Sequence, residues 1–327
     1  MLKYVLNRVF GLLITLLGVS VIVFMLVHMS PGDPIRIMLG EQARPDDVER
    51  LNRLYGFDRP LPVQYVSWLG SALQGDLGTS IRQQAPVLTL IAERLPATIE
   101  LAVAALLLAV IAGIPLGVLA AVYRNTPIDI ASMFLSLVGV AAPNFWVGLL
   151  LLSTVAMSVT WIPVFGRGDP LLATFWTFVT SGNPAPLWDS LRHLLLPAVA
   201  VGTSIMALIT RLTRSSLLEV LRLDFVRTAT AKGVHNSTVI SKHALRNALL
   251  PVVTIVGVQF GALLGGAIVT EVVFAWPGIG RLIVDSISQR DFPVVQGSIL
   301  MLAAVFVLAN LLVDLSYSLI NPRIRYD

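Results

Sequence analysis

Six apolar runs, each roughly long enough to cross a lipid bilayer, constrain this chain of 327 residues more than any other feature. A helix needs about 20 residues to cross the hydrocarbon core. The runs lie at 9–29, 98–122, 130–155, 194–212, 252–274 and 294–320. Because 56% of the residues are hydrophobic and only 13% charged, too few polar side chains remain to cover a water-soluble globule. The sequence predicts an all-α, polytopic membrane protein with six transmembrane helices, the first of them retained rather than cleaved.

Basic residues gather on one side of these spans, which predicts the orientation of the chain. Twelve Lys and Arg residues stand there against four acidic ones: Lys3, Arg8, Arg124, Arg211, Arg214, Arg222, Arg227, Lys232, Lys242, Arg246, Arg323 and Arg325 against Asp129, Glu219, Asp224 and Asp327. The segments on the other side are close to neutral. We therefore expect both termini and the segment 211–251 to be cytoplasmic.

The two outer segments have patterns of their own. In segment 30–97 a helical run follows Pro45, with Val48, Leu51 and Tyr55 on one face. After Pro60-Leu-Pro62 a second run follows, with Val63, Val66, Trp68, Leu69 and Leu73. These runs predict a small helical extracytoplasmic cap. Segment 160–193 is rich in Trp and Phe, and its apolar piece 171–179 is too short to span, so we expect it to lie at the membrane interface as an aromatic belt.

Several kinds of chemistry are excluded or disfavoured. The chain has no cysteine, its four histidines lack the spacing of metal ligands, and no Gly-x-x-x-x-Gly-Lys-Ser/Thr loop is present to bind a nucleotide. Its basic residues have no accompanying aromatic strip, which disfavours nucleic-acid binding. Ionisable residues are almost missing within the spans, and Glu271 and Asp314 are the exceptions. We expect Glu271 to be an interfacial carboxylate rather than a gate or helix-pairing group, and Asp314 to pair with a neighbouring helix or a nearby arginine.

Small residues recur every four positions in two spans, at Gly113 and Gly117 and again at Gly257, Gly261 and Gly265. Such spacing lets another helix backbone approach closely, either within the chain or in another subunit. Polar residues within or beside the spans are candidates for lining a translocation path, although ordinary helix packing explains such residues more often. They are Asn144, Thr203, Ser204 and Gln259.

Nearly the whole chain resembles the first permease of the bacterial ABC importers for dipeptides, oligopeptides, glutathione and nickel. The cytoplasmic stretch from Phe225 to Gly233, Phe-Val-Arg-Thr-Ala-Thr-Ala-Lys-Gly, is similar to the loop of these permeases in which an Ala-rich stretch precedes a glycine. The general importer loop has Glu-Ala-Ala where this chain has Arg227-Thr-Ala229. Further matching motifs are Pro31-Gly-Asp-Pro34, Gly75-Asp-Leu-Gly-Thr-Ser80, Arg211-Leu-Thr-Arg-Ser-Ser216, Trp276-Pro-Gly-Ile-Gly280 and Arg290-Asp-Phe-Pro293.

The resemblance implies a permease with the type I ABC importer fold in a bacterial inner membrane, importing peptides or similar small solutes such as glutathione or a nickel chelate. It implies a second homologous permease, two ABC ATPase subunits that bind ATP and Mg, and an extracytoplasmic substrate-binding protein, with no cofactor or catalytic residue on this chain. The residues expected to couple this chain to an ATPase are Arg227, Thr228, Ala229, Ala231, Lys232, Gly233 and Arg246.

This interpretation divides the chain into three parts: an N-terminal tail and first helix at 1–29, an extracytoplasmic helical region at 30–97, and a permease core at 98–327 with its coupling segment at 213–251. Two other functions are the alternatives. An ion-coupled secondary transporter and a membrane-embedded enzyme both depend on buried ionisable groups, which the spans nearly lack.

Overall fold

The computed structural model describes residues 2–29, 44, 46, 49–50, 58–156 and 158–320, which are mostly helical. No strand forms within these ranges, where Thr79 and Pro86 make an isolated antiparallel bridge. The all-α prediction is therefore confirmed for this part of the chain. The helices are α1 (Leu2–Met29), α4 (Leu61–Leu73), α5 (Val87–Val122), α6 (Pro127–Ala141), α7 (Asn144–Leu151), η1 (Leu152–Ala156), α8 (Leu171–Ser181), α9 (Ala185–Val220), α10 (Asp224–Ala231), α11 (Asn236–Thr238), η2 (Val239–Ala244), α12 (Leu245–Ala248), α13 (Leu250–Gly266), α14 (Ile268–Val273), α15 (Ile279–Ser288) and α16 (Phe292–Ile320).

Among the described helices, four are long and apolar enough to cross a membrane by themselves: α1, α5, α9 and α16. Two bent pairs raise the number to six if each pair is one span. Helix α5 begins at Val87 rather than at residue 98, because its first turns bury Val87, Leu90 and Ile91 against α15 and α16. The predicted boundary between residues 97 and 98 therefore falls inside one continuous helix.

The predicted span 130–155 is not a continuous helix. Helix α6 ends at Ala141, α7 begins at Asn144, and the two parts of this pair meet at 108°. Pro143 explains the break, since proline has no N–H to donate and forces the preceding residue out of the helical region. Accordingly, Ala142 is extended, with ψ 126°.

The predicted span 252–274 is also divided. It consists of α13 and the short helix α14, separated at Ala267. Helix α13 is in turn bent by 50° from the helical turns 236–248 that precede it. The break at Ala267 separates Glu271 from the long apolar helix and places it on a short helix of its own.

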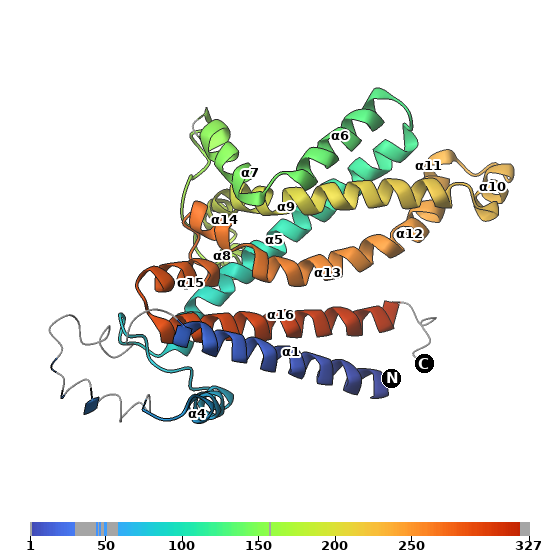
Figure 1. Ribbon diagram of the computed structural model, residues 1–327. Helices are drawn as coiled ribbons and strands as arrows, with labels where there is room; N and C mark the ends of the chain where they lie inside the picture. Colours follow the sequence, from blue (N-terminus) through green and yellow to red (C-terminus); the bar gives the residue numbers. More distant parts are fainter. Residues whose placement is uncertain are drawn as a thin grey trace.

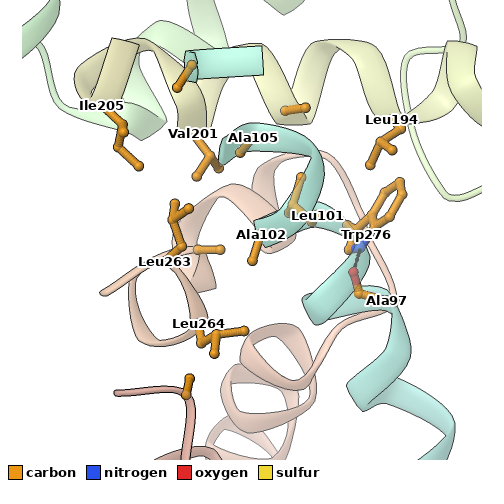
Figure 2. Close-up of a cluster of buried hydrophobic side chains, with 14 of the residues drawn as sticks. Ala97, Leu101, Ala102, Ala105, Leu194, Val201, Ile205, Leu263, Leu264 and Trp276 are labelled. Carbon is orange, nitrogen blue, oxygen red and sulfur yellow. Dashed lines mark hydrogen bonds between the residues drawn. The ribbon is translucent and has the colours of Figure 1, made fainter. Parts of the chain in front are cut away.

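The largest buried cluster lies where α5, α9 and α13 meet (Figure 2). Small residues allow the close approach of α5 and α9. A Cβ atom added at Gly113 would lie 2.9 Å from the carbonyl oxygen of Met206, and one at Gly202 would lie 2.8 Å from that of Ala105. At Gly117 the distance to the Thr210 carbonyl oxygen would be 2.6 Å. Gly113 and Gly117 therefore serve packing within this chain.

The helices define two ends of the molecule (Figure 1). The start of α1, the end of α16 and the segment from α10 to α12 lie together at one end, called here the α10 end. Helices α4, α8, α14 and α15 lie at the opposite end, called the α15 end. The segments expected to share a side of the membrane thus lie at the same end of the structure.

Helix α1 packs along α16, and Arg8 of α1 forms an ion pair with Asp314 of α16. The prediction that Asp314 pairs with a neighbouring helix or an arginine is confirmed. Towards the α15 end, Tyr65 and Trp68 of α4 lie against the ring of Phe24, at centroid distances of 5.4 and 5.9 Å. Helix α4 confirms the second helical run of the predicted cap, while the first run, with Val48, Leu51 and Tyr55, lies outside the described residues.

Candidate functional site

The segment between α9 and α13 forms a projection at the α10 end (Figure 1). Helix α10 begins after Leu223, whose extended backbone (ψ 150°) turns the chain away from α9, and Asp224 occupies its first turn, where the helix dipole favours a negative charge. Gly233 ends the helix with φ +77°, a conformation that suits glycine, while its N–H bonds the Thr230 carbonyl at 3.0 Å. The chain then returns through α11, η2 and α12 to α13.

A buried base holds this projection on the long helices. Val226 of α10 and Val239, Ala244 and Ala248 of the return segment pack around Leu217 of α9. Ala121 of α5 completes the cluster. The base therefore joins the projection to both α5 and α9.

The predicted coupling residues divide by their exposure. Six of them face solvent: Arg227, Thr228, Ala231, Lys232, Gly233 and Arg246. Ala229 does not, because it is half-buried against the projection's own apolar base. Its small size therefore serves internal packing. A Cβ atom at Gly233 would meet no heavy atom within 4 Å, so the positive φ accounts for this glycine.

Two apolar residues of the projection were not among the predicted coupling residues. Leu223 and Phe225 are 50% and 42% exposed, although they stand at the start of a short helix surrounded by polar groups. Large exposed aromatics beside cations are typical of surfaces that bind another protein. In the sequence, Phe225 comes directly before Val226. Adjacent residues of a helix point in different directions, so Phe225 lies off the face of α10 that Val226 turns inward.

An ion pair ties α9 to α6 close to the projection. The Arg214 guanidinium donates to both oxygens of Asp129, with Nε–Oδ1 at 2.5 Å and Nη2–Oδ2 at 2.7 Å. Asp129 is 3% exposed and also accepts the backbone N–H of Asn125 at 2.9 Å. This bidentate geometry fixes the start of α6 against α9.

The four path candidates lie on three different elements. Asn144 begins α7, Thr203 and Ser204 lie on α9, and Gln259 lies on α13. Thr203 packs on Gly139 of α6 and donates its hydroxyl hydrogen to the Val199 carbonyl. Within the described residues no hydrogen bond joins any two of the four.

The glycines of α13 also differ among themselves. A Cβ atom at Gly261 would lie 2.5 Å from Oδ1 of Asn310 on α16, which shows close packing inside the chain. The same atom at Gly265 would meet nothing within 4 Å, and Gly257 is half-buried.

Glu271 is buried at the α15 end, with 1% exposure, and the expectation of an interfacial carboxylate is wrong. It accepts the Thr98 hydroxyl at 2.7 Å and the Arg281 backbone N–H at 3.1 Å. Thr98 in turn accepts the Ile279 N–H at 2.9 Å. The carboxylate therefore fastens the turn between α14 and α15 to α5, and the same turn is held where Trp276 Nε1 donates to the Ala97 carbonyl (Figure 2).

Two further carboxylates at this end were assigned no role from the sequence. Glu100, within the predicted span 98–122, pairs with Arg167, whose guanidinium carbon lies 5.9 Å from the centre of the Trp276 ring. Asp291, 2% exposed, accepts the Ser80 hydroxyl at 2.5 Å and the backbone N–H groups of Ile81 and Arg82 at 3.2 Å. These groups fix the loops at the α15 end, and no described group of three His, Asp or Glu side chains could hold a metal ion.

Comparison with known proteins shows the family to which this chain belongs. Residues 113–326 match the family model of the binding-protein-dependent transport system inner membrane component, and residues 1–102 match the N-terminal model for such membrane components. The chain belongs to this family. It is a permease of the ABC transporter type, a non-catalytic membrane subunit, as the sequence resemblance implies.

Individual relatives match this permease over its full length. The dipeptide transport system permease protein DppB of Alkalihalophilus pseudofirmus is 46% identical, with all of both chains covered. The protein of the same name from Escherichia coli is 42% identical, with 100% of this chain and 99% of that protein covered. The glutathione transport system permease protein GsiC of Escherichia coli is 43% identical over all of both chains. These matches give no support to the ion-coupled transporter.

Proposed function

We propose that this permease forms the translocation path of an ATP-driven importer for peptides or similar small solutes, together with a second homologous permease. Two ABC ATPase subunits would bind ATP and Mg, and an extracytoplasmic binding protein would deliver the substrate. In this proposal the α10 end faces the cytoplasm of a bacterial inner membrane, as the excess of basic residues there supports. The relatives, which serve dipeptide and glutathione transport, support the substrate class.

The observation that carries the proposal is the exposed surface of α10 standing on a buried base. Phe225 and the cations Arg227 and Lys232 are exposed on α10, while Val226 holds the same helix on α9. An ATPase that closes on ATP would move this surface as a unit. The movement would then pass along α9 to α5 and α6, so that the path opens alternately to the two sides.

Replacing Phe225 by alanine tests this coupling. The assembled transporter would be purified from membranes through a tag on this chain, and the copurifying ATPase would be quantified. We expect Phe225→Ala to reach the membrane at normal levels, because the ring is exposed, and to retain roughly tenfold less ATPase with a matching loss of uptake.

Leu172→Ala is the matched control, since Leu172 is an exposed apolar residue of α8 at the α15 end. It should leave ATPase copurification unchanged. Normal ATPase retention and normal uptake by Phe225→Ala would show that α10 is not the coupling surface.

A further inference from the structure

The second half of helix α9 has one face that its neighbours in this chain leave partly open. Gly202 packs on α5, Thr203 packs on α6, and Val201 joins the cluster that includes α13. Figure 1 shows α9 between α6 and α13. The remaining face carries three polar residues whose spacing of seven and four positions places them on one stripe: Ser204, Arg211 and Ser215.

The composition of this stripe does not suit contact with lipid. Ser204 is half-buried, Arg211 and Ser215 are exposed, and the one apolar residue between them, Leu208, is itself half-buried. A surface that suits contact with lipid acyl chains is apolar and exposed, as on α5, where Ile111 is 71% exposed. The stripe on α9 has no such exposed apolar residue. A charged side chain in a membrane helix faces a protein interior or a water-filled cavity, because its burial in hydrocarbon is costly.

The depth of Arg211 strengthens this argument. A Cβ atom at Gly117 of α5 would lie 2.6 Å from the Thr210 carbonyl oxygen, so Arg211 is level with Gly117. From Gly117 the apolar end of α5 continues to Val122, about 8 Å further at the helical rise. Arg211 therefore lies inside the end of the apolar region, and Ser204 lies roughly 10 Å deeper along α9.

Arg211 also differs from the nearby Arg214, which is paired with Asp129. Among the described residues no carboxylate lies within ion-pair distance of Arg211. An exposed guanidinium on a polar stripe matches a carboxylate, which it can bind through two parallel hydrogen bonds. Free peptides carry such a group at their C-terminus.

We propose that the stripe formed by Ser204, Arg211 and Ser215 lines the translocation path, and that Arg211 binds the carboxylate of the passing peptide near the cytoplasmic mouth. The assignment of a peptide rests on the proposed function. The accessibility of the stripe to water and its positive electrostatic potential do not rest on the proposed function, because both can be measured without substrate.

Cysteine chemistry tests the stripe in the assembled transporter, and the native chain has no cysteine that would interfere. Ser204→Cys would be treated in inverted membrane vesicles with small anionic and cationic methanethiosulfonates, and labelling would be read on this chain. We expect both reagents to react, with the anionic one favoured. Adding Arg211→Gln should lower the anionic-to-cationic rate ratio by about fivefold or more, since a single nearby charge is removed. Leu107→Cys, exposed on the apolar surface of α5, is the control and should not react.

Uptake tests the role of the carboxylate. With the binding protein saturated by a dipeptide, Arg211→Gln should lower the maximal uptake rate about tenfold, while Arg211→Lys should retain most of it. Both variants should copurify normal amounts of ATPase, because Arg211 lies on α9 about 13 Å along the helix from its end at Val220, before the chain enters α10. The proposal fails if Ser204→Cys is as unreactive as Leu107→Cys. It also fails if Arg211→Gln leaves the anionic-to-cationic labelling ratio unchanged, or if Arg211→Gln transports normally. Absence of any ATP-driven dipeptide uptake by the unmodified transporter would instead refute the proposed substrate class, leaving the labelling result to decide the stripe.

Discussion

Gly278 shows how strongly a single position can depend on a distant part of the chain. A Cβ atom there would lie 2.2 Å from the Glu271 carboxylate, which Thr98 and the Arg281 N–H hold in place. The carboxylate cannot move aside without losing those hydrogen bonds. The glycine of the Trp276-Pro-Gly-Ile-Gly280 motif is thus required by a close approach rather than by its backbone angles, since its φ is −97°.

Gly278→Ala should therefore lower the free energy of unfolding by about 1–3 kcal/mol, as in other overpacked sites. Thermal unfolding of the purified transporter would measure the loss. Gly70→Ala on α4, where the added carbon meets nothing within 4 Å, should be neutral. In a Glu271→Ala background most of the cost of Gly278→Ala should vanish; equal costs in both backgrounds would contradict the contact.

Among the elements, α9 connects the most parts of the structure. It packs on α5 through Gly202, on α6 through Thr203 and Arg214, and on the projection through Leu217. The ion pair of Arg214 with Asp129 is the polar part of this connection. Breaking it would leave the guanidinium without its partner while most of that side chain stays covered, at 23% exposure.

Asp129→Asn should consequently destabilise the transporter by roughly 1–3 kcal/mol, because the partly buried guanidinium loses its charged partner. The ion pair of Arg8 with Asp314 provides the comparison, since the Arg8 side chain is 47% exposed. Arg8→Gln should cost less than about 1 kcal/mol. Equal shifts of the melting temperature for the two variants would show that burial does not set the strength of these pairs.

At the scale of the whole molecule, the two ends differ in charge and in the way the chain is held. The α10 end carries the exposed basic projection, whereas the α15 end holds its loops with the buried carboxylates Glu271 and Asp291. We propose that the α10 end is cytoplasmic and the α15 end extracytoplasmic. A binding protein would then meet loops that are already fixed.

Single cysteines can establish this orientation. Ser71 of α4 and Ser181 of α8 lie at the α15 end and are exposed, as is Ser237 of α11 in the projection. Cysteines at Ser71 and Ser181 should react with an impermeant thiol reagent added to intact cells or spheroplasts. A cysteine at Ser237 should react only after the membrane is opened, and its labelling from outside would reverse the proposed topology.

The sequence by itself determined the helical membrane class, the family and the existence of a basic segment between two apolar spans, because apolar length, charge pattern and motif spacing are local properties of the chain. Tertiary structure decided the rest. Hydropathy could not show that Glu271 is buried, since its partner Thr98 lies on another helix, nor that Ser80 bonds Asp291 from 211 positions away. It also could not separate Ala229, packed on Leu217 and its neighbours, from the exposed Phe225. Whether a polar or apolar side chain faces inward depends on which helices fold against it, and only the packed molecule contains that information.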